Sequence, residues 1–182
     1  MSIFYISDLH FGHQNVIKFD HRPYADTDEM DRDMIRKWNN RVGKDDDVYV
    51  VGDFAFRSGY DPAWYLQQLS GHKHLIVGNH DGKMLKNKNA MKYWETVDNL
   101  TSIQDGDKSI ILCHFPILEW NQMRHWHLLV YGHIHANTED DTYKIMKQYR
   151  PYAYNAAACI NGYQPVLLDE LIANNKKFQE EH

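Results

Sequence analysis

Five short apolar runs, each followed at once by polar side chains that can bind metal ions or transfer protons, constrain the fold of this chain most. The runs are residues 3–7, 48–51, 75–77, 109–113 and 128–131. Short apolar runs bounded by turn residues are typical of strands in a sheet that is covered on both faces. Because ligands of open α/β sheets bind beyond the carboxyl ends of the strands, the five following loops can converge on one site.

The segments between the first runs predict helices. Residues 27–42 place apolar side chains at helical spacing behind an Asp or Thr cap, and Asp61 with Pro62 opens a second, short helix. The resulting order of strands and helices over residues 3–77 predicts parallel strands with right-handed crossovers. Further strands are expected around Tyr154 and Val166, and residues 167–182 predict a terminal helix that frays.

Length and composition set outer limits. The chain has 182 residues, 43% of them hydrophobic, and shows no linker or internal repeat, so a single domain over residues 1–182 is expected. No apolar run is long enough to span a membrane and no signal-peptide pattern opens the chain, which favours a cytoplasmic protein. Cys113 and Cys159 both stand in apolar surroundings, which favours buried thiols over a disulfide framework.

Charge and histidine content bear on the partner. The formal net charge is -5 and the basic residues are scattered, so no basic stripe for a long nucleic acid is evident and a small substrate is favoured. A folded basic patch assembled from distant residues stays open. Histidine is over-represented, with 12 residues, and several follow the apolar runs.

The polar residues after the runs form an ordered set of motifs. They read DLH, GDF, GNHD, CHFP and GHIH, and the key positions are Asp8, His10, Asp53, Asn79, His80, His114, His133 and His135. This set resembles the calcineurin-like metallophosphoesterase superfamily, whose motifs are D-x-H, G-D, G-N-H-[DE], a lone H and G-H-x-H. The opening DLHFGH is similar to that of small bacterial and phage members. The resemblance implies an α/β fold, a layered αββα sandwich of two mixed β-sheets flanked by helices.

The resemblance also implies a pair of divalent metal ions. It places Asp8, His10 and His135 on one ion and Asn79, His114 and His133 on the other, with Asp53 bridging them. Such a centre would hydrolyse a phosphodiester or nucleotide-like small substrate by attack of a metal-bridging hydroxide. Histidine, carboxylate and amide ligands suit manganese as the first expectation, with iron, nickel or zinc as alternatives.

The GNHD stretch supplies the expected catalytic group. The resemblance makes His80 the residue that protonates the departing oxygen or stabilises its charge. Gly78 is expected to let the backbone turn sharply. Asp81 either lies behind His80 and sets its tautomer and pKa, or is a solvated turn carboxylate.

Substrate contacts are predicted from three further residues. His13 can touch substrate, although a histidine hydrogen-bonded to backbone is an alternative. Arg22 and Arg57 can reach a phosphate oxygen, although either can be an ordinary surface residue. With so few cations at hand, the singly charged diester is favoured over the monoester. A phosphomonoesterase, including a protein phosphatase, and a catalytically silent binding scaffold stay as alternatives.

Overall fold

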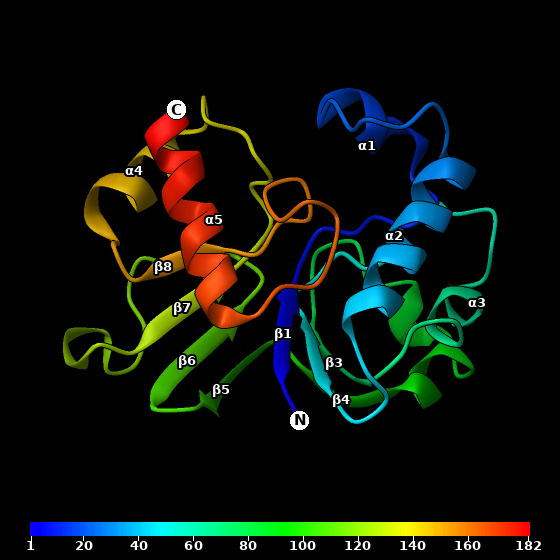
Figure 1. The fold of residues 1–182 in the computed structure, drawn as a ribbon, viewed down its shortest axis with the longest axis horizontal. Helices are drawn as coiled ribbons and strands as arrows, with labels where there is room; N and C mark the ends of the chain where they lie inside the picture. The colour runs from blue at the N-terminus through cyan, green and yellow to red at the C-terminus, as the bar shows by residue number, and fades with distance from the viewer.

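A four-stranded parallel sheet forms the first half of the molecule in the computed structural model, which describes residues 1–182 (Figure 1). Its strands, in spatial order, are β1 (Ile3–Ile6), β2 (Asp47–Val50), β3 (His72–Ile76) and β4 (Trp94–Asp98). All three pairings are parallel, as the alternation of strands and helices predicts. The carboxyl ends of β1, β2 and β3 therefore lie along one edge.

The second sheet is mixed. Its strands, in spatial order, are β5 (Leu100–Asp105), β6 (Lys108–Cys113), β7 (Leu128–Tyr131) and β8 (Ala153–Asn155). β5 runs antiparallel to β6, and the other pairings are parallel. A two-residue turn with Gly106 at φ 60° joins β5 to β6, which makes their pairing antiparallel. The layered α/β arrangement is confirmed, with the difference that only this sheet is mixed.

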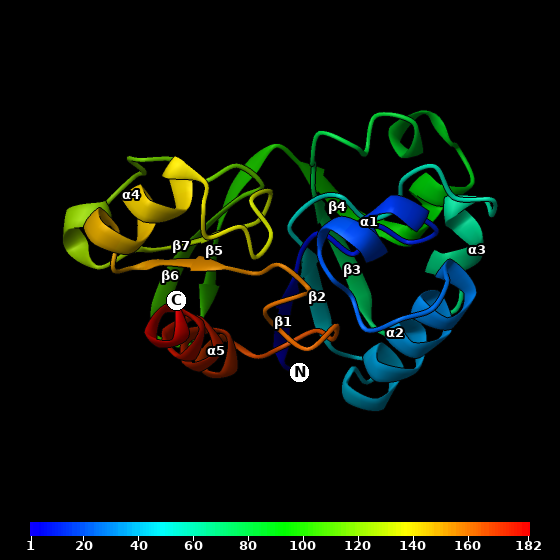
Figure 2. The same cartoon turned by 90° about the horizontal axis from the view of Figure 1, so that it is seen from above.

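Helices cover the outer faces of both sheets (Figures 1 and 2). The first sheet is covered by α1 (Gln14–Phe19), α2 (Thr27–Arg41) and α3 (Pro62–Leu66). The second sheet carries α4 (Asp141–Tyr149), and α5 (Leu168–Glu181) packs beside β8 and β1. Single 3-10 turns occur at Met84–Lys86, Ala90–Tyr93 and Met123–His125.

The predicted helix starts are confirmed by their caps. The Asp26 side chain accepts a hydrogen bond from the Glu29 amide at the start of α2, and Asp61 accepts one from the Ala63 amide at the start of α3. Each cap satisfies a backbone N–H that has no partner inside the helix.

The apolar runs are continuous because both faces of their strands are buried. In β1, Phe4 and Ile6 face the cluster under the helices, whereas Tyr5 faces the cluster between the two sheets. The inter-sheet cluster joins Tyr5 to residues of β6 and β7 such as Leu112 and Val130. Burying both faces leaves no polar alternation in the sequence.

The edges of the two sheets meet at β1. The Ser7 amide donates to the Ala156 carbonyl at 2.8 Å, and the Ala156 amide donates to Tyr131 at 2.7 Å. The strand expected around Val166 is wrong, because Val166 makes only one antiparallel bridge, to Tyr5, next to Pro165.

Two other expectations can be compared directly. Cys113 and Cys159 form no disulfide, as predicted, and Cys113 is buried, whereas Cys159 is only partly buried. No helix has the length and apolar character needed to cross a membrane.

Candidate metal centre

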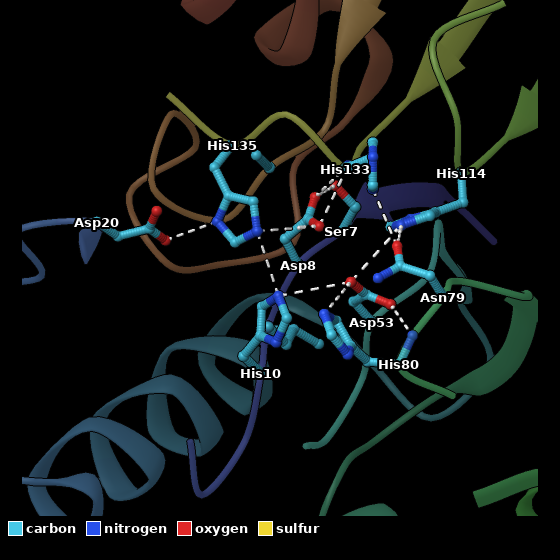
Figure 3. A network of polar contacts seen from close by, with 12 residues as sticks. Ser7, Asp8, His10, Asp20, Asp53, Asn79, His80, His114, His133 and His135 are labelled. Atoms are coloured by element: carbon cyan, nitrogen blue, oxygen red, sulfur yellow. Dashed lines mark hydrogen bonds and ion pairs between the residues drawn. The ribbon is translucent and has the colours of Figure 1, made fainter. Parts of the chain in front are cut away.

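The loops after five strands bring the predicted ligands together at the seam between the sheets (Figure 3). Asp8 and His10 follow β1, Asp53 follows β2, Asn79 and His80 follow β3, His114 follows β6, and His133 and His135 follow β7. Every predicted ligand therefore lies at the carboxyl end of a strand, where parallel strands present their loops on one side.

The first group comprises Asp8, His10 and His135. One ligand atom from each lies within 4.8 Å of the other two. Nε2 of His135 is 3.2 Å from Nε2 of His10 and 3.5 Å from Oδ1 of Asp8. Neighbouring ligands of one ion, at bonds of about 2.1 Å, are separated by about 3.0 to 3.4 Å. These three side chains are therefore already spaced to hold one divalent cation.

The second group comprises Asn79, His114 and His133. Oδ1 of Asn79 lies 3.0 Å from Nε2 of His114 and 2.9 Å from Nδ1 of His133. An amide oxygen between two imidazole nitrogens matches the ligand spacing of a second cation.

Asp53 lies between the groups. Its Oδ2 atom is 3.6 Å from Nε2 of His10 in the first group and 3.6 Å from Nε2 of His114 in the second. Its Oδ1 atom accepts a hydrogen bond from the His80 amide at 2.8 Å, which fixes the orientation of the carboxylate. One oxygen placed equally near both groups can bridge two cations.

Hydrogen bonds fix the ring nitrogens that face the centre. Nδ1 of His114 is 2.8 Å from the Val51 carbonyl, which only accepts, so Nδ1 carries the proton and the Nε2 lone pair is free. Nδ1 of His135 is held in the same way by Asp20 at 2.8 Å. Nδ1 of His10 is buried and has no hydrogen-bond partner. Clustered carboxylates and oriented imidazoles fit a pair of divalent cations.

Burial prepares the imidazoles as neutral ligands. It lowers the pKa of His10 well below its ordinary value and also lowers the pKa of His133. For His135, burial also acts to lower the pKa, but the hydrogen bond to Asp20 and the charges of Asp8 and Asp20 outweigh it, and the pKa is raised. Burial raises the pKa of Asp53, against the opposing charge of His114. Cations would stabilise this buried carboxylate in its charged form.

The ligand positions share an unusual backbone conformation. Five of them adopt positive φ: Asp8 (54°), His10 (52°), Asp53 (56°), His133 (75°) and His135 (51°). Side-chain-bearing residues rarely occupy this left-handed region, and such strain gathers at functional sites. The D-x-H and H-x-H pairs are therefore aimed by left-handed loop geometry and not by the alternation of an extended strand.

Two motif glycines make room for ligands of other motifs. A Cβ atom at Gly78 would lie 2.3 Å from Oδ1 of Asp53, and one at Gly132 would lie 2.6 Å from Oδ2 of Asp8. Neither glycine has a positive φ. The chain does turn sharply after Gly78, where the Asp81 amide donates to the Gly78 carbonyl at 3.3 Å, and the glycine itself is needed for the close approach of Asp53.

His80 lies beside the two groups with its side chain 33% exposed. Its ring packs on Phe56, with 4.0 Å between centroids, and Nε2 is 3.9 Å from Oδ2 of Asp53. The imidazole can therefore face both the centre and a molecule bound over it.

Asp81 differs from both expectations for it. The residue is fully buried, and its two oxygens accept hydrogen bonds from the amides of Asp53 (2.9 Å), Gly78 (2.8 Å) and Phe54 (3.0 Å). It is neither a solvated carboxylate nor hydrogen-bonded to His80, because the tight turn after Gly78 points it inward. Burial raises its pKa to about 6 against those backbone hydrogen bonds. Asp81 holds the Asp53 loop in place.

Arg22 is also used differently from either expectation. It is 4% exposed, and its guanidinium donates to the carbonyls of Asp8 (2.8 Å) and Leu9 (2.7 Å) and pairs with Asp20 at 2.9 Å. The group has no free donors directed at a substrate and is not at the surface. It fixes the left-handed loop that presents Asp8.

His13 and Arg57 have different surroundings. His13 is 8% exposed, lies against Phe56 and His10 with centroid separations of 4.9 and 5.5 Å, and has an unpartnered Nδ1. The alternative of a backbone hydrogen bond is therefore wrong for His13. Arg57 is exposed, forms no ion pair, and has its guanidinium 5.1 Å from the Phe56 ring. Substrate contact by either residue stays a prediction.

Two residues that support the ligands were missed in the sequence. Ser7 donates to Oδ2 of Asp8 at 2.6 Å, and Asp20 orients His135. Ser7 carried a usable signal, since it is a polar residue at the end of a buried strand. Asp20 sits in the loop FDHRP and carried none, because nothing local relates it to His135.

An open cleft of about 560 Å³ adjoins the centre. Its lining includes His133 and His135 from the centre, Phe19 at the end of α1, and Asn137 and Thr138 after β7. The volume is in the range of small-molecule sites.

Comparison with known proteins identifies relatives of this chain. No family model matches the chain. The uncharacterized protein MJ1445 of Methanocaldococcus jannaschii is 31% identical over 173 residues, which cover 93% of this chain and 89% of that protein. The gene 66 protein of Mycobacterium phage L5 is 29% identical over 160 residues, covering 72% of this chain and 76% of that protein.

A solved structure is similar over nearly its whole length. It is the protein of unknown function AQ665 from Aquifex aeolicus, with a TM-score of 0.72 and 26% identity, covering 92% of this chain and 96% of that one. The chain thus belongs to the family of MJ1445. Its two-sheet fold and the convergence of the five motifs on one site (Figure 3) agree with the resemblance of those motifs to the calcineurin-like metallophosphoesterases.

Proposed function

We propose that this protein is a two-metal-dependent phosphoesterase that hydrolyses a small phosphodiester. The observation that carries the proposal is the position of Asp53, whose Oδ2 atom is 3.6 Å from a ligand nitrogen of each group. A carboxylate shared by two sets of metal-capable side chains is the arrangement that a binuclear centre requires.

Each cation would have its own set of ligands, and one ligand would be shared. Asp8, His10 and His135 would hold one ion and Asn79, His114 and His133 the other, with Asp53 common to both. When bound, the two ions supply Lewis acidity toward a phosphoryl oxygen and lower the pKa of water. Manganese is the metal we propose first, and iron, nickel and zinc suit the same donors.

His80 is the proposed proton donor to the leaving oxygen. Its side chain is partly exposed and lies over the centre, and the Asp53 carboxylate accepts from its backbone amide. That hydrogen bond ties the His80 backbone to the bridging ligand. A general acid in this position typically contributes about 10²- to 10⁴-fold to the rate.

The diester is favoured by the surroundings of Arg22. Because its guanidinium is engaged by the Asp8 and Leu9 carbonyls and Asp20, Arg57 is the one predicted arginine left to meet a phosphate oxygen. A monoester carries about two negative charges and a diester about one, so a site with one free arginine suits the diester better. The monoesterase and the silent scaffold are kept as outcomes of the test.

The test combines metal analysis with hydrolysis of matched chromogenic mono- and diesters. The wild type should bind about two divalent ions and cleave the diester faster than the monoester. Asp53→Ala should lose metal and activity, and His80→Ala should keep metal and turn over about 10²- to 10⁴-fold more slowly. Asp107→Ala, which removes an exposed carboxylate in the β5–β6 turn, is the control.

Each contrary outcome has a definite meaning. Undiminished hydrolysis by Asp53→Ala would remove the bridging assignment. Loss of metal from His80→Ala would move His80 among the ligands. A preference for the monoester would replace the diesterase proposal, and metal uptake without hydrolysis of either ester would favour the scaffold.

A further inference from the structure

Exposed aromatic rings flank the metal centre. Phe19 is 55% exposed and Phe115 is 44% exposed, although a phenylalanine exposed to this degree gains little from folding. Phe19 ends α1, and Phe115 directly follows the ligand His114. Neither position is required by the core clusters.

Each ring contacts a histidine of a different ligand group. Phe19 meets His135 of the first group edge-on, with 5.6 Å between centroids and 69° between planes. Phe115 meets His133 of the second group edge-on, at 4.8 Å and 62°. Neither ring stacks in parallel on another aromatic ring. Each phenylalanine thus lies beside a different ligand group of the centre.

The cleft beside Phe19 is suited to an uncharged group. Its lining contains Asp20 and Asp140 and no lysine or arginine, so a second phosphate would be repelled there. Asn137 and Thr138 offer polar groups to the edge of a planar ring. A neutral, flat and polar-edged group is what this lining complements.

We propose that Phe19 and Phe115 are stacking platforms for two nucleobases, one on each side of the scissile phosphodiester. This inference rests on the proposed function and narrows its substrate to dinucleotides and very short single strands. Aromatic rings bind bases of single strands by stacking, with little preference for sequence. A longer strand would need a basic groove along its backbone, and the cleft beside Phe19 is lined by no lysine or arginine.

The arrangement also explains the preference for a diester in a second way. A diester carries two substituents on its phosphorus, and a binding surface on each side of the centre can hold both. A monoester carries one and would leave one platform unused.

The test compares a deoxyadenosine dinucleotide with the same linkage in which hydrogen replaces both bases. The manganese-loaded wild type should show kcat/KM for the dinucleotide higher by about tenfold or more, from stacking alone. Phe19→Ala and Phe115→Ala should each lower that value about tenfold and leave the value for the base-free substrate within about twofold. Phe19→Trp and Phe115→Trp should keep the higher kcat/KM for the dinucleotide than for the base-free substrate.

Two controls separate stacking from damage. Metal content is measured for every variant, because both rings touch ligand histidines. Trp126→Ala removes a more exposed aromatic ring, 67% exposed, just before β7, at the end of that strand opposite His133. This variant should leave kcat/KM for both substrates unchanged.

The outcomes distinguish the inference from the function. Equal cleavage of both substrates, or alanine variants that lower both alike with full metal content, would overturn the stacking inference and leave the phosphodiesterase standing. If the loaded wild type cleaves neither diester, the proposed function and the inference fail together.

Discussion

Nδ1 of His135 donates a hydrogen bond to Asp20 at 2.8 Å across 115 residues of sequence. Asp20 also pairs with Arg22, whose guanidinium holds the carbonyls of Asp8 and Leu9. Asp8 and His135 are both ligands of the first group. A buried chain of polar contacts therefore fixes these two ligands relative to each other before any cation arrives.

Replacing Asp20 tests this chain. Asp20→Asn should weaken divalent metal binding about 10- to 100-fold, because the carboxylate orients His135 and makes its imidazole a stronger donor. It should also lower the free energy of unfolding, because Arg22 is left buried with less compensation. Metal titration calorimetry and urea unfolding measure the two effects. Asp107→Asn, which removes the charge of an exposed carboxylate in the β5–β6 turn, is the control, and equal metal affinity in both variants would count against the role of Asp20.

Asp81→Asn should destabilise the loop that carries Asp53. The carboxylate accepts three backbone N–H groups, and an amide nitrogen in place of one oxygen would set donor against donor. The expected loss in the free energy of unfolding is about 1 to 3 kcal/mol, with weaker metal binding. Urea unfolding and metal titration measure these changes.

Asp81→Asn also separates a loop role from a role on His80. The pH midpoints of hydrolysis should stay where they are in the wild type, because the Asp81 carboxylate makes no hydrogen bond with the His80 imidazole. A shifted midpoint with unchanged stability would restore the direct role.

Metal removal should loosen the joint between the sheets. Each ligand group takes residues from loops of both sheets, so bound cations would connect them directly. A ligand at 100 times its Kd stabilises the folded state by about 2.7 kcal/mol, which for a chain of this size corresponds to about 5 to 10 °C in Tm. Thermal melts in manganese and in chelator should show this difference. Asp53→Ala should abolish it, and identical melts of the wild type would contradict a site shared by the sheets.

Asp31 should make stability depend on pH. It is 4% exposed, and burial raises its pKa to about 6, against hydrogen bonds from Gly12 and Tyr65. Between about pH 4, where the unfolded chain releases this proton, and about pH 6, the folded state still holds it. The free energy of unfolding therefore falls as pH rises through this window, by about 2 to 3 kcal/mol.

Asp31→Asn should remove this pH-dependent fall in the free energy of unfolding. The amide can accept from Gly12 and donate to Tyr65, whose own proton can turn to Ser58 at 2.7 Å. The variant should match the wild type near pH 4 and exceed it above pH 6 in urea unfolding. Asp28→Asn, an exposed change in the same helix, should follow the wild type, and a variant less stable at pH 7.5 would refute the account.

The parts of the fold that could be predicted are those with a local cause. The five runs are apolar because both faces of their strands are buried, and the starts of α2 and α3 are marked in the sequence by capping residues. β4 and β5 went unpredicted because each lies at a sheet edge with many exposed side chains, so neither contains a continuous apolar run. α1 and α4 are short, and α1 has no side-chain cap.

The ligand set could be expected from its order in the sequence, whereas the supporting residues could not. Asp81 and Arg22 carry charges that suit a catalytic site, yet both turn inward to backbone groups. That orientation depends on backbone groups of other loops, those of Asp53 and Phe54 for Asp81 and those of Asp8 and Leu9 for Arg22, which residue type alone does not specify. Asp20 depends on a contact between distant loops, which only the assembled sheets create.

The left-handed backbone conformation at five predicted ligand positions serves metal binding but lowers the stability of the fold. Glycine adopts this conformation without the steric cost that a side chain adds. Substitutions there would relax the backbone while removing the ligand, so the most robust metal-free form of this fold would be an inactive one. The family can therefore gain resistance to heat elsewhere in the molecule, but at these five positions only by giving up the centre.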